Sequence, residues 1–217
     1  MKLNEAKSHY MIFTRTKQEF ATRLFLNENK LDQISVSKLL GIWISEDLSW
    51  SKNTKEICIK SYSRISMITK LKYVGVGIDD LVNIYILFIR SCVEYCSVVF
   101  HSSLTMEQGV DLERIQKVCL KVMLGESYVD YEAALEMTGL TTLYARREKR
   151  CLDFALKSLS HPKNSRLFPL NPYYLSGVHE ERDRERFTVI FAKTSTYKKS
   201  AVPYCQRLLN THFSKKK

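Results

Sequence analysis

The 217 residues, of which 45% are hydrophobic and 26% charged, have an ordinary globular composition, and 7 glycines and 4 prolines are too few for a disordered chain or an all-β fold with many tight turns. The net charge of +11 is unevenly placed, because residues 1–140 hold 17 basic and 17 acidic residues whereas residues 141–217 hold 17 basic and 6 acidic ones. Such a field suits a polyanion, either nucleic acid or an anionic membrane, and is also compatible with a merely soluble basic surface.

The first fifty residues carry the short apolar runs and the alternation of β-structure. Residues 10–14 form a short apolar strand, and residues 24–26 lead into a turn-rich link. Residues 34–37 alternate apolar and polar side chains before the apolar run 39–44, so we expect a short antiparallel hairpin centred on 34–44. Gly41 stands inside the second strand, where a glycine marks a bulge or a close backbone approach.

From residue 50 the apolar residues follow a helical period. Asn53 with Glu56 resembles a capping box and begins a helix. The apolar face of this helix comprises Cys58, Tyr62, Ile65, Ile68 and Leu71. Gly75 and Gly77 end the helix, and Asp79 is a good N-cap for the next one.

That next helix, over residues 81–100, carries two neighbouring apolar seams. One seam comprises Leu81, Tyr85, Phe88, Cys92, Tyr95 and Val99, and the other comprises Val82, Ile86, Ile89, Val93 and Cys96. Such a wide apolar surface predicts a central place in a bundle, with Tyr85, Phe88, Cys92 and Tyr95 mostly buried. A coiled coil is the rival, but the pattern is too wide and too short for one.

Helical signals continue through the middle of the chain. Thr105 with Gln108 forms a capping box, Glu113 and Lys117 are spaced to pair, and Gly125 is a natural helix end.

Two further helices follow before the pattern weakens. A short helix over residues 131–137 ends at Gly139, and Thr141 or Thr142 caps a long helix that reaches about residue 160. Beyond it the pattern is weak, with a possible strand at 187–192. We therefore predict an α+β fold, mostly α: residues 1–50 with the β-hairpin, residues 51–160 as a helical bundle, and residues 161–217 as a basic, weakly structured tail.

The last long helix carries a basic stripe. Arg146, Arg150 and Lys157 recur at helical spacing, with Arg147 and Lys149 beside them. Leu152, Ala155, Leu156 and Leu159 occupy other positions of the helix, so we expect the basic residues to face outward together. They could then contact phosphates with little sequence preference. The rival interpretation is a solvated helix face without a partner.

The spacing of the cysteines and the hydropathy of the chain indicate the cellular compartment of the protein. Cys58, Cys92, Cys96, Cys119, Cys151 and Cys205 contain no C-x-x-C pair, which disfavours zinc ribbons and favours buried thiols in a reduced compartment. The polar N-terminus has no signal peptide, and Arg90 and Glu94 interrupt the longest apolar run, so we expect no membrane span. The expected location is intracellular, either cytoplasmic or nuclear.

Short motifs follow one another along nearly the whole chain. They are LNEAKS at 3–8 with MIF at 11–13; KLLGIWI at 38–44 with LSW at 48–50; IY, FIRS and EY at 84–85, 88–91 and 94–95; LERIQK at 112–117; Leu140, Leu143, Arg146 and Arg147; and Ser200, Pro203, Leu209 and Asn210. In this order they resemble the C-terminal part of non-LTR retrotransposon reverse transcriptases, and the jockey-like branch fits best.

The resemblance implies roles for several residues. The first block ends the polymerase palm, where Lys7 would act as a general acid on the pyrophosphate leaving group. The second block resembles the primer grip, in which Gly41 lets the backbone approach the nucleic acid and Lys38 contacts a phosphate. The helices from residue 53 onward resemble the thumb, which follows the template–primer backbone. The candidate contacts there are Lys52, Lys55, Lys60 and Arg64.

The resemblance also bears on activity. Polymerases hold metal ions, here magnesium, on aspartates, and the blocks that carry these aspartates lie upstream of Met1 in register. The pair Asp79-Asp80 opens a helix and is interpreted as a cap. The resemblance thus implies a truncated RNA-directed DNA polymerase, inactive by itself and without a cofactor, that retains contacts to RNA or an RNA–DNA hybrid. Its other partners would be the missing upstream palm and fingers.

Two alternatives remain beside that interpretation. The first is a recruited, transposon-derived module that binds nucleic acid or protein without catalysis. The second, a small independent enzyme, is disfavoured because the sequence shows no Ser-His-Asp, metal or phosphate-loop signature. The histidines share no spacing and are assigned no chemistry; they are His9, His101, His161, His179 and His212.

Overall fold

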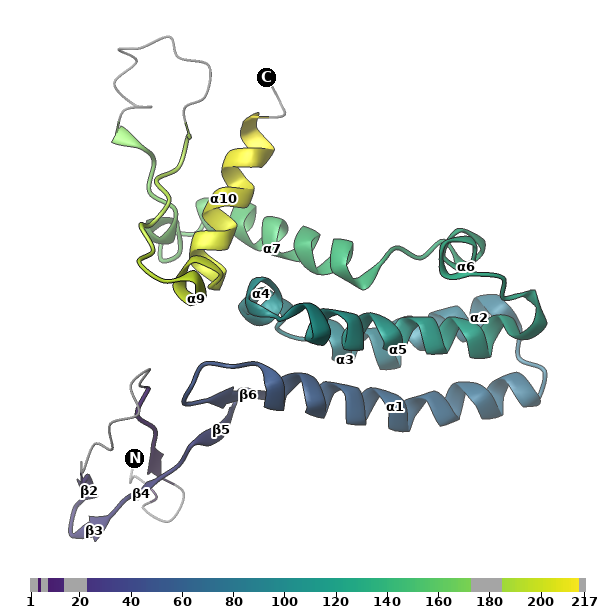
Figure 1. The fold of residues 1–217 in the computed structure, drawn as a ribbon, viewed down its shortest axis with the longest axis horizontal. Helices are drawn as coiled ribbons and strands as arrows, with labels where there is room; N and C mark the ends of the chain where they lie inside the picture. The colour runs from purple at the N-terminus through teal and green to yellow at the C-terminus, as the bar shows by residue number, and fades with distance from the viewer. Residues whose placement is uncertain (1–3, 5–7, 14–22, 173–184, 215–217) are drawn as a thin grey trace. The chain divides into compact units, whose positions relative to one another are not determined.

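The computed structural model describes residues 4, 8–13, 23–172 and 185–214, and the chain divides into two compact units, residues 1–56 and 57–217 (Figure 1). The described residues are mostly helical with a few short strands, which confirms the predicted α+β, mostly α class. The division falls inside helix α1 (Ser51–Tyr73).

The described residues of the first unit contain three small pairs of strands. They are β1 (His9–Tyr10) with β4 (Asp32–Gln33) in parallel, β2 (Phe25–Leu26) with β3 (Asn29–Lys30) antiparallel, and β5 (Val36–Leu39) with β6 (Ile42–Ser45) antiparallel. The last pair confirms the predicted hairpin. Leu40 and Gly41 form its turn with φ of 46° and 91°, so the prediction that Gly41 lies inside the second strand is wrong. A two-residue hairpin turn with both φ positive matches the strand twist, and glycine supplies one of them without strain.

Helix α1 begins at Ser51, three residues before the start that an N-cap at Asn53 predicts. Asn53 lies inside its first turn, and its side-chain oxygen accepts a hydrogen bond from the Trp43 backbone N–H at 3.1 Å, so the predicted capping role is wrong. Within residues 57–73, Ile65 and Ile68 are buried as predicted, whereas Tyr62 is exposed. The helix ends before Gly75, whose φ of 84° suits a glycine.

The predicted helix over residues 81–100 is a run of short helical pieces. They are α2 (Ile78–Ile84), the π-helix η2 (Tyr85–Arg90), α3 (Ser91–Glu94), α4 (Ser97–Phe100) and the 3₁₀-helix η3 (His101–Ser103). Gly77, not Asp79, is the N-cap of α2. Asp79 lies in the first turn of the helix, where its negative charge still interacts favourably with the helix dipole. The run breaks at Cys96, which has a left-handed conformation with φ of 51°.

The π-helix changes which side chains are buried. Tyr85, Ile89 and Val93 are fully buried, whereas Phe88 is 50% and Tyr95 52% exposed, so the predicted burial of these two aromatic residues is wrong. Cys92, which was also predicted to be mostly buried, is half-buried. A π-helix closes i→i+5 turns and so inserts about one residue into the helical period. After Tyr85 the buried face therefore follows positions 89 and 93 rather than 88 and 92.

The capping signals of the following helices are confirmed. Helix α5 (Met106–Leu124) begins with both hydrogen bonds of the Thr105–Gln108 capping box and ends at Gly125. Helix α6 (Tyr131–Thr138) ends at Gly139, and Thr142 caps α7 (Leu143–Leu159).

The described C-terminal part is better ordered than predicted. After η5 (Ser165–Leu167) come α9 (Ser195–Lys198) and α10 (Ala201–Ser214). Helix α10 packs on α7 and buries a cluster that comprises Cys151, Ala155, Phe168, Phe187, Cys205 and Leu209. The weakly structured tail is therefore wrong for residues 201–214. Where a strand was predicted at 187–192, there is one bridge, between Leu170 and Phe187.

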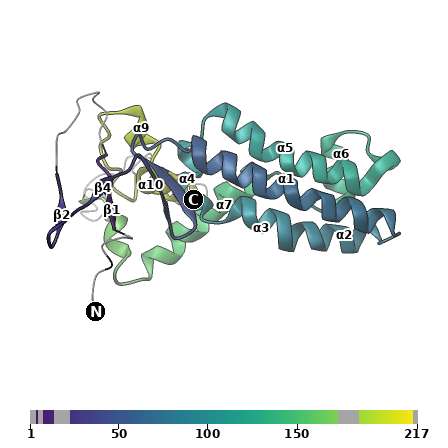
Figure 2. The same cartoon turned by 90° about the horizontal axis from the view of Figure 1, so that it is seen from below.

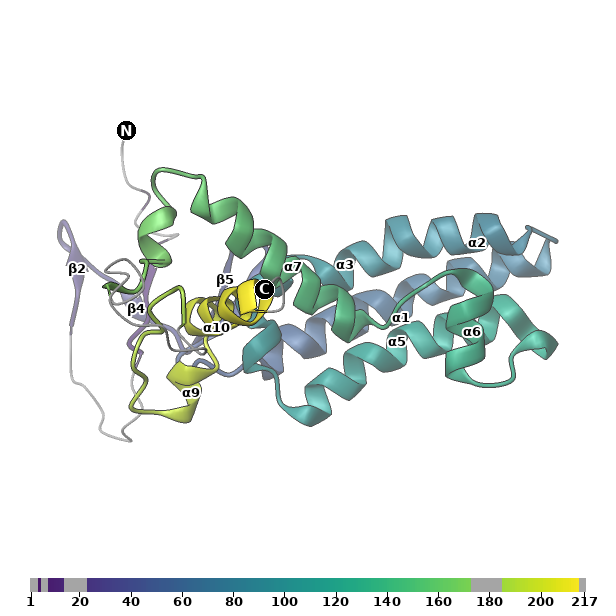
Figure 3. The ribbon, with the colours of Figure 1, turned by 90° about the horizontal axis from the view of Figure 1, so that it is seen from above.

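In the second unit the helices run along one another in layers. Helix α5 and the α2–α3 run lie side by side, with α1 along one face of the pair and α7 on the other (Figures 1 and 3). Figure 2 shows α1 along the line between α5 and α3. The central position predicted for residues 81–100 is met only in part, because Leu81, Tyr85, Ile89 and Phe100 are fully buried whereas Leu87, Phe88, Tyr95 and Val99 are exposed.

Replacing Ile89 and Phe88 in turn tests the register that the π-helix sets. We expect Ile89→Ala to lower the free energy of unfolding by about 2–5 kcal/mol, the usual cost of truncating a buried aliphatic side chain. Phe88→Ala should cost about 1 kcal/mol or less, because half of its side chain is already in water. Urea unfolding followed by circular dichroism measures both, and the reverse order would contradict the shifted register.

Candidate nucleic-acid interface

Helix α7 is anchored at its N-terminus by a carboxylate from α5. Glu113 accepts hydrogen bonds from the backbone N–H groups of Leu143 (2.9 Å) and Tyr144 (3.1 Å), and from the hydroxyl of Tyr131. A carboxylate at this position accepts hydrogen bonds from N–H groups that have no partner within the helix. Its negative charge also interacts favourably with the positive end of the helix dipole. The predicted Glu113–Lys117 pair is absent from the ion pairs of the described residues, and the Lys117 ammonium lies 4.8 Å from the Tyr131 ring centre instead.

A second carboxylate, Glu94 at the end of α3, holds the side of α7. Its side chain is 2% exposed, and it accepts hydrogen bonds from two nitrogens of Arg146 and lies 2.9 Å from a nitrogen of Arg150. The hydrogen bond to Glu94 raises the pKa of Arg146. One carboxylate thus orients two guanidinium groups, and the three side chains together keep a net positive charge.

A third arginine adds to this positive field. Burial, followed by the positive charge of Arg146, lowers the pKa of Arg90. Like charges gathered around a single carboxylate leave an excess that an external anion would neutralise.

Arg147 does not lie on the outward face where the basic stripe predicted it. It is 1% exposed, and its Nε and one terminal nitrogen have no hydrogen-bond partner among the described residues. Burial lowers the pKa of its guanidinium. Its position one residue beyond Arg146 turns it toward the interior, because adjacent helix positions point in directions about 100° apart.

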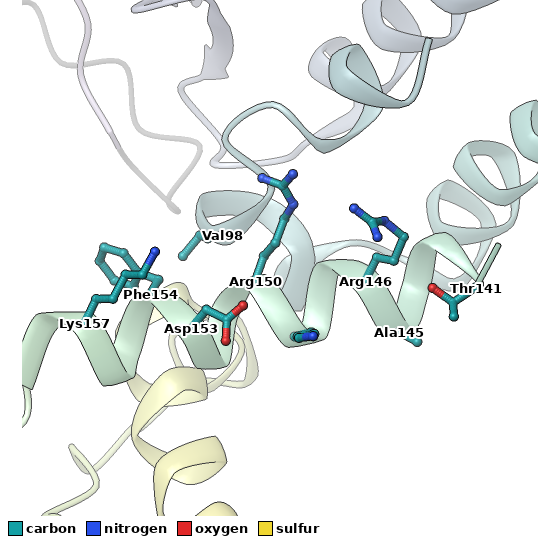
Figure 4. Close-up of a pocket in the computed structure, with 9 residues that line it drawn as sticks. Val98, Thr141, Ala145, Arg146, Arg150, Asp153, Phe154 and Lys157 are labelled. Carbon is teal, nitrogen blue, oxygen red and sulfur yellow. The ribbon is translucent and has the colours of Figure 1, made fainter. Parts of the chain in front are cut away.

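The other basic residues of the stripe come together in an open groove of about 760 Å³ along α7 (Figure 4). Its charged lining comprises Arg146, Lys149, Arg150, Asp153 and Lys157. Figure 4 shows the guanidinium groups of Arg146 and Arg150 rising on the same side of the helix. The sequence pattern missed two apolar members of the lining, Phe154 and Val98. The helical spacing of Phe154 relative to Arg150 and Lys157 could have indicated it.

In the first unit, Lys38, predicted in the primer grip, and Lys52, predicted in the thumb, both lie over the ring of Trp43. The ammonium groups of Lys38 and Lys52 lie 5.8 and 5.0 Å from its ring centre, within cation–π range. Lys52 also pairs with Glu56 at 2.8 Å. Lys7 lies outside the described residues.

The thumb-like candidates on α1 do not form one exposed set. Lys55 and Lys60 are exposed. Arg64 instead donates to the backbone carbonyl of Phe88, in the π-helix. That carbonyl lies where the wider turn disturbs the regular helix hydrogen bonds, so Arg64 has a structural use.

Beside the groove helix, His101 occupies a buried aromatic setting. Its ring lies between those of Tyr144 (5.1 Å) and Tyr204 (5.7 Å), and its Nδ1 has no hydrogen-bond partner among the described residues. Burial, helped by the charge of Arg147, lowers the pKa of His101 to about 4. The imidazole is therefore neutral near pH 7.

Comparisons with known proteins add no assignment. No protein-family model matches the chain, and neither a curated protein nor a solved structure is significantly similar to it. In the part of the chain that the structure describes, no group of three or more His, Cys, Asp or Glu side chains is placed to hold a metal ion. No single helix there has the length and hydropathy of a membrane span, although the bent pair Ile78–Glu94 and Ser97–Ser103 meets that test jointly.

Replacing Glu94 tests how far this carboxylate organises α7. We expect Glu94→Gln to lower the free energy of unfolding by about 3 kcal/mol, because removing one partner of a buried ion pair leaves the other uncompensated. Arg150 is half exposed, so its ion pair with Glu94 contributes less to stability than a buried pair does. The expected loss of unfolding free energy is therefore near the lower end of the values for buried ion pairs. The control Glu136→Gln, an exposed glutamate on α6, should change the unfolding free energy by less than about 0.5 kcal/mol. Equal effects would contradict the anchoring role.

His101 predicts a pH dependence of stability. Its folded pKa of about 4 lies below the ordinary value of 6.5, so the unfolded chain binds the proton first. Stability should be unaffected by His101 above about pH 6.5 and should fall by roughly 3 kcal/mol as the pH drops toward 4. His101→Phe keeps a ring between Tyr144 and Tyr204 without titrating. Subtracting its pH–stability curve from that of the wild type isolates the effect, and a flat difference would refute it.

Proposed function

We propose that this chain is a nucleic-acid-binding helical region of the kind found at the C-terminal end of non-LTR reverse transcriptases, and that it holds RNA or an RNA–DNA hybrid through the α7 groove. The motif order supports the family, and the groove supports the binding. Its contribution is recognition of the nucleic-acid backbone, with no catalytic step assigned to its residues.

One observation carries this proposal: four cations of one helix line the same open groove, and two of them are fixed in place. Glu94 orients Arg146 and Arg150 before any ligand arrives, which lowers the entropy lost on binding. A guanidinium so held still has N–H groups to offer to a phosphate in its rigid fork. Lys149 and Lys157 supply two point charges on flexible stems at the same groove.

Phosphate contacts of this type bind without reading sequence. Charged side chains on phosphates set the position and orientation of the nucleic acid, whereas base edges specify sequence. Binding should therefore tolerate many sequences and weaken steeply with salt, since each neutralised phosphate releases counterions.

A second candidate function is a protein contact on another face of the same unit. Leu87, Phe88 and Tyr95 are each at least half exposed, and Leu87 and Tyr95 are eight residues apart along the α2–α4 run. Large exposed apolar side chains that form a contiguous patch are typical of interaction surfaces. We propose this face as the contact to a partner protein, such as the upstream palm and fingers of a polymerase or the target of a recruited module.

Neutralising two groove lysines tests the nucleic-acid proposal. We expect Lys149→Gln with Lys157→Gln to weaken binding of a fluorescent single-stranded RNA and of an RNA–DNA hybrid. The slope of log affinity against log salt should fall by about 1 for each phosphate that the variant no longer neutralises. Fluorescence anisotropy at several salt concentrations measures both quantities.

The matched control is Lys163→Gln with Lys198→Gln, which removes the same charge from two exposed lysines away from the groove lining. This control should retain most of the affinity and the slope of the wild type. If both double variants lose affinity equally, net charge alone drives binding and the groove is not the site.

A further inference from the structure

Phe154 is the aromatic residue of the α7 groove and does not belong to the buried face of the helix. In the C-terminal half of α7 the buried positions are the small residues Cys151, Ala155 and Ser158, whereas Phe154 is 37% exposed and lines the groove. Val98 of α4 adds a second apolar group to the same lining. A large aromatic ring on a basic, open surface is available to a ligand.

The order of side chains along α7 separates charge from apolar surface. Arg150 and Lys157 are two helical turns apart, roughly 10 Å along the axis, with Asp153 and Phe154 between them. A carboxylate repels phosphate, so the stretch around Asp153 is unsuited to the backbone of a nucleic acid. The cations on both sides suit phosphates, and the ring between them suits an uncharged planar group.

From this arrangement we infer that the groove takes single-stranded nucleic acid, with its phosphates on the flanking cations and one unstacked base on the ring of Phe154. This inference rests on the proposed function and names the form of nucleic acid that the groove prefers. Every base has a face that can stack on an aromatic ring, so stacking tolerates any sequence. Within a duplex those faces are covered by neighbouring base pairs, and only single strands can present them.

The size of the groove agrees with this occupant. The groove is open and about 760 Å³ in volume, which leaves room for a base and its sugar along α7. An acidic peptide is the competing occupant, since it would also use the four cations. It would gain nothing specific from an aromatic ring, and polyglutamate serves as its probe.

The experiment compares Phe154→Leu with Phe154→Trp in the full chain. Leucine keeps apolar area without an aromatic face, and we expect it to weaken binding of an oligouridylate of about 12 nucleotides by about tenfold, the loss of one stacked base. Tryptophan should restore or exceed wild-type affinity. The control Phe191→Leu alters a phenylalanine that is 83% exposed and outside the groove lining, and should bind as the wild type does.

An abasic oligonucleotide of the same length separates stacking from phosphate contact. It keeps the phosphates and removes the bases, so wild type and Phe154→Leu should bind it equally, and about as weakly as Phe154→Leu binds oligouridylate. The same oligouridylate paired with its DNA complement should bind wild type and Phe154→Leu with equal affinity. The wild-type protein should bind oligouridylate more tightly than the abasic strand. This comparison tests base stacking without the variant, so it remains valid even if circular dichroism shows that Phe154→Leu folds poorly.

The outcomes separate this inference from the proposed function. If Phe154→Leu binds oligouridylate like the wild type while the Lys149/Lys157 variant binds weakly, the phosphate site stands and the stacked base is wrong. If the wild type binds no nucleic acid even at low salt, both proposals fail. If polyglutamate of equal charge displaces RNA as well as oligouridylate does, the groove recognises acidic protein and the inference is overturned.

Discussion

The buried carboxylate of Glu94 is the constraint on which the α7 surface depends. A charge that is 2% exposed must be paired, because an isolated ion in the interior costs several kcal/mol. Arg146 and Arg150 supply that pairing from α7, so the ion pairs join α3 to α7 at the same point where they orient the groove. Together with Glu113 at the N-terminus of α7, Glu94 fixes the position of the helix by charge as well as by packing.

The inward direction of Glu94 depends in turn on the π-helix that precedes it. The inserted residue shifts the buried positions to Ile89 and Val93, and Glu94, the next residue, is also buried, whereas Tyr95 is 52% exposed. Arg64 of α1 binds the Phe88 carbonyl inside the irregular turn. A backbone irregularity of this kind is often found at functional sites. In this chain the same register places a buried carboxylate under the groove and an apolar face outside it.

The basic composition of the last third of the chain overstates the charge available to a ligand. Arg146 and Arg150 share the charge of Glu94, and Arg147 is buried, so the mobile positive charge at the groove comes mostly from Lys149 and Lys157. Orientation, not only charge, therefore distinguishes this surface from an ordinary solvated helix. The fixed guanidinium groups, the flexible ammonium groups and the ring of Phe154 are the three kinds of contact on which the proposed binding of a single strand depends.

The sequence by itself determined the features whose causes lie within a few residues. The capping box of Thr105 and Gln108, the helix end at Gly125, the cap at Thr142 and the β5–β6 hairpin were all predictable, because the atoms that bond are neighbours in the chain. The basic stripe of α7 was predictable for the same reason, since helical spacing alone brings Arg146, Lys149, Arg150 and Lys157 near one another.

Only the tertiary structure decided which of those side chains are free and which are used internally. Glu94 and Arg146 are 52 positions apart, and no local pattern indicates their bond. The same holds for the π-helix register, for the burial of Arg147 and for the packing of α10 on α7, where a tail was predicted. The physical reason is common to all four: burying a charge or an apolar face is favourable only against a particular partner, and that partner comes from a distant part of the chain.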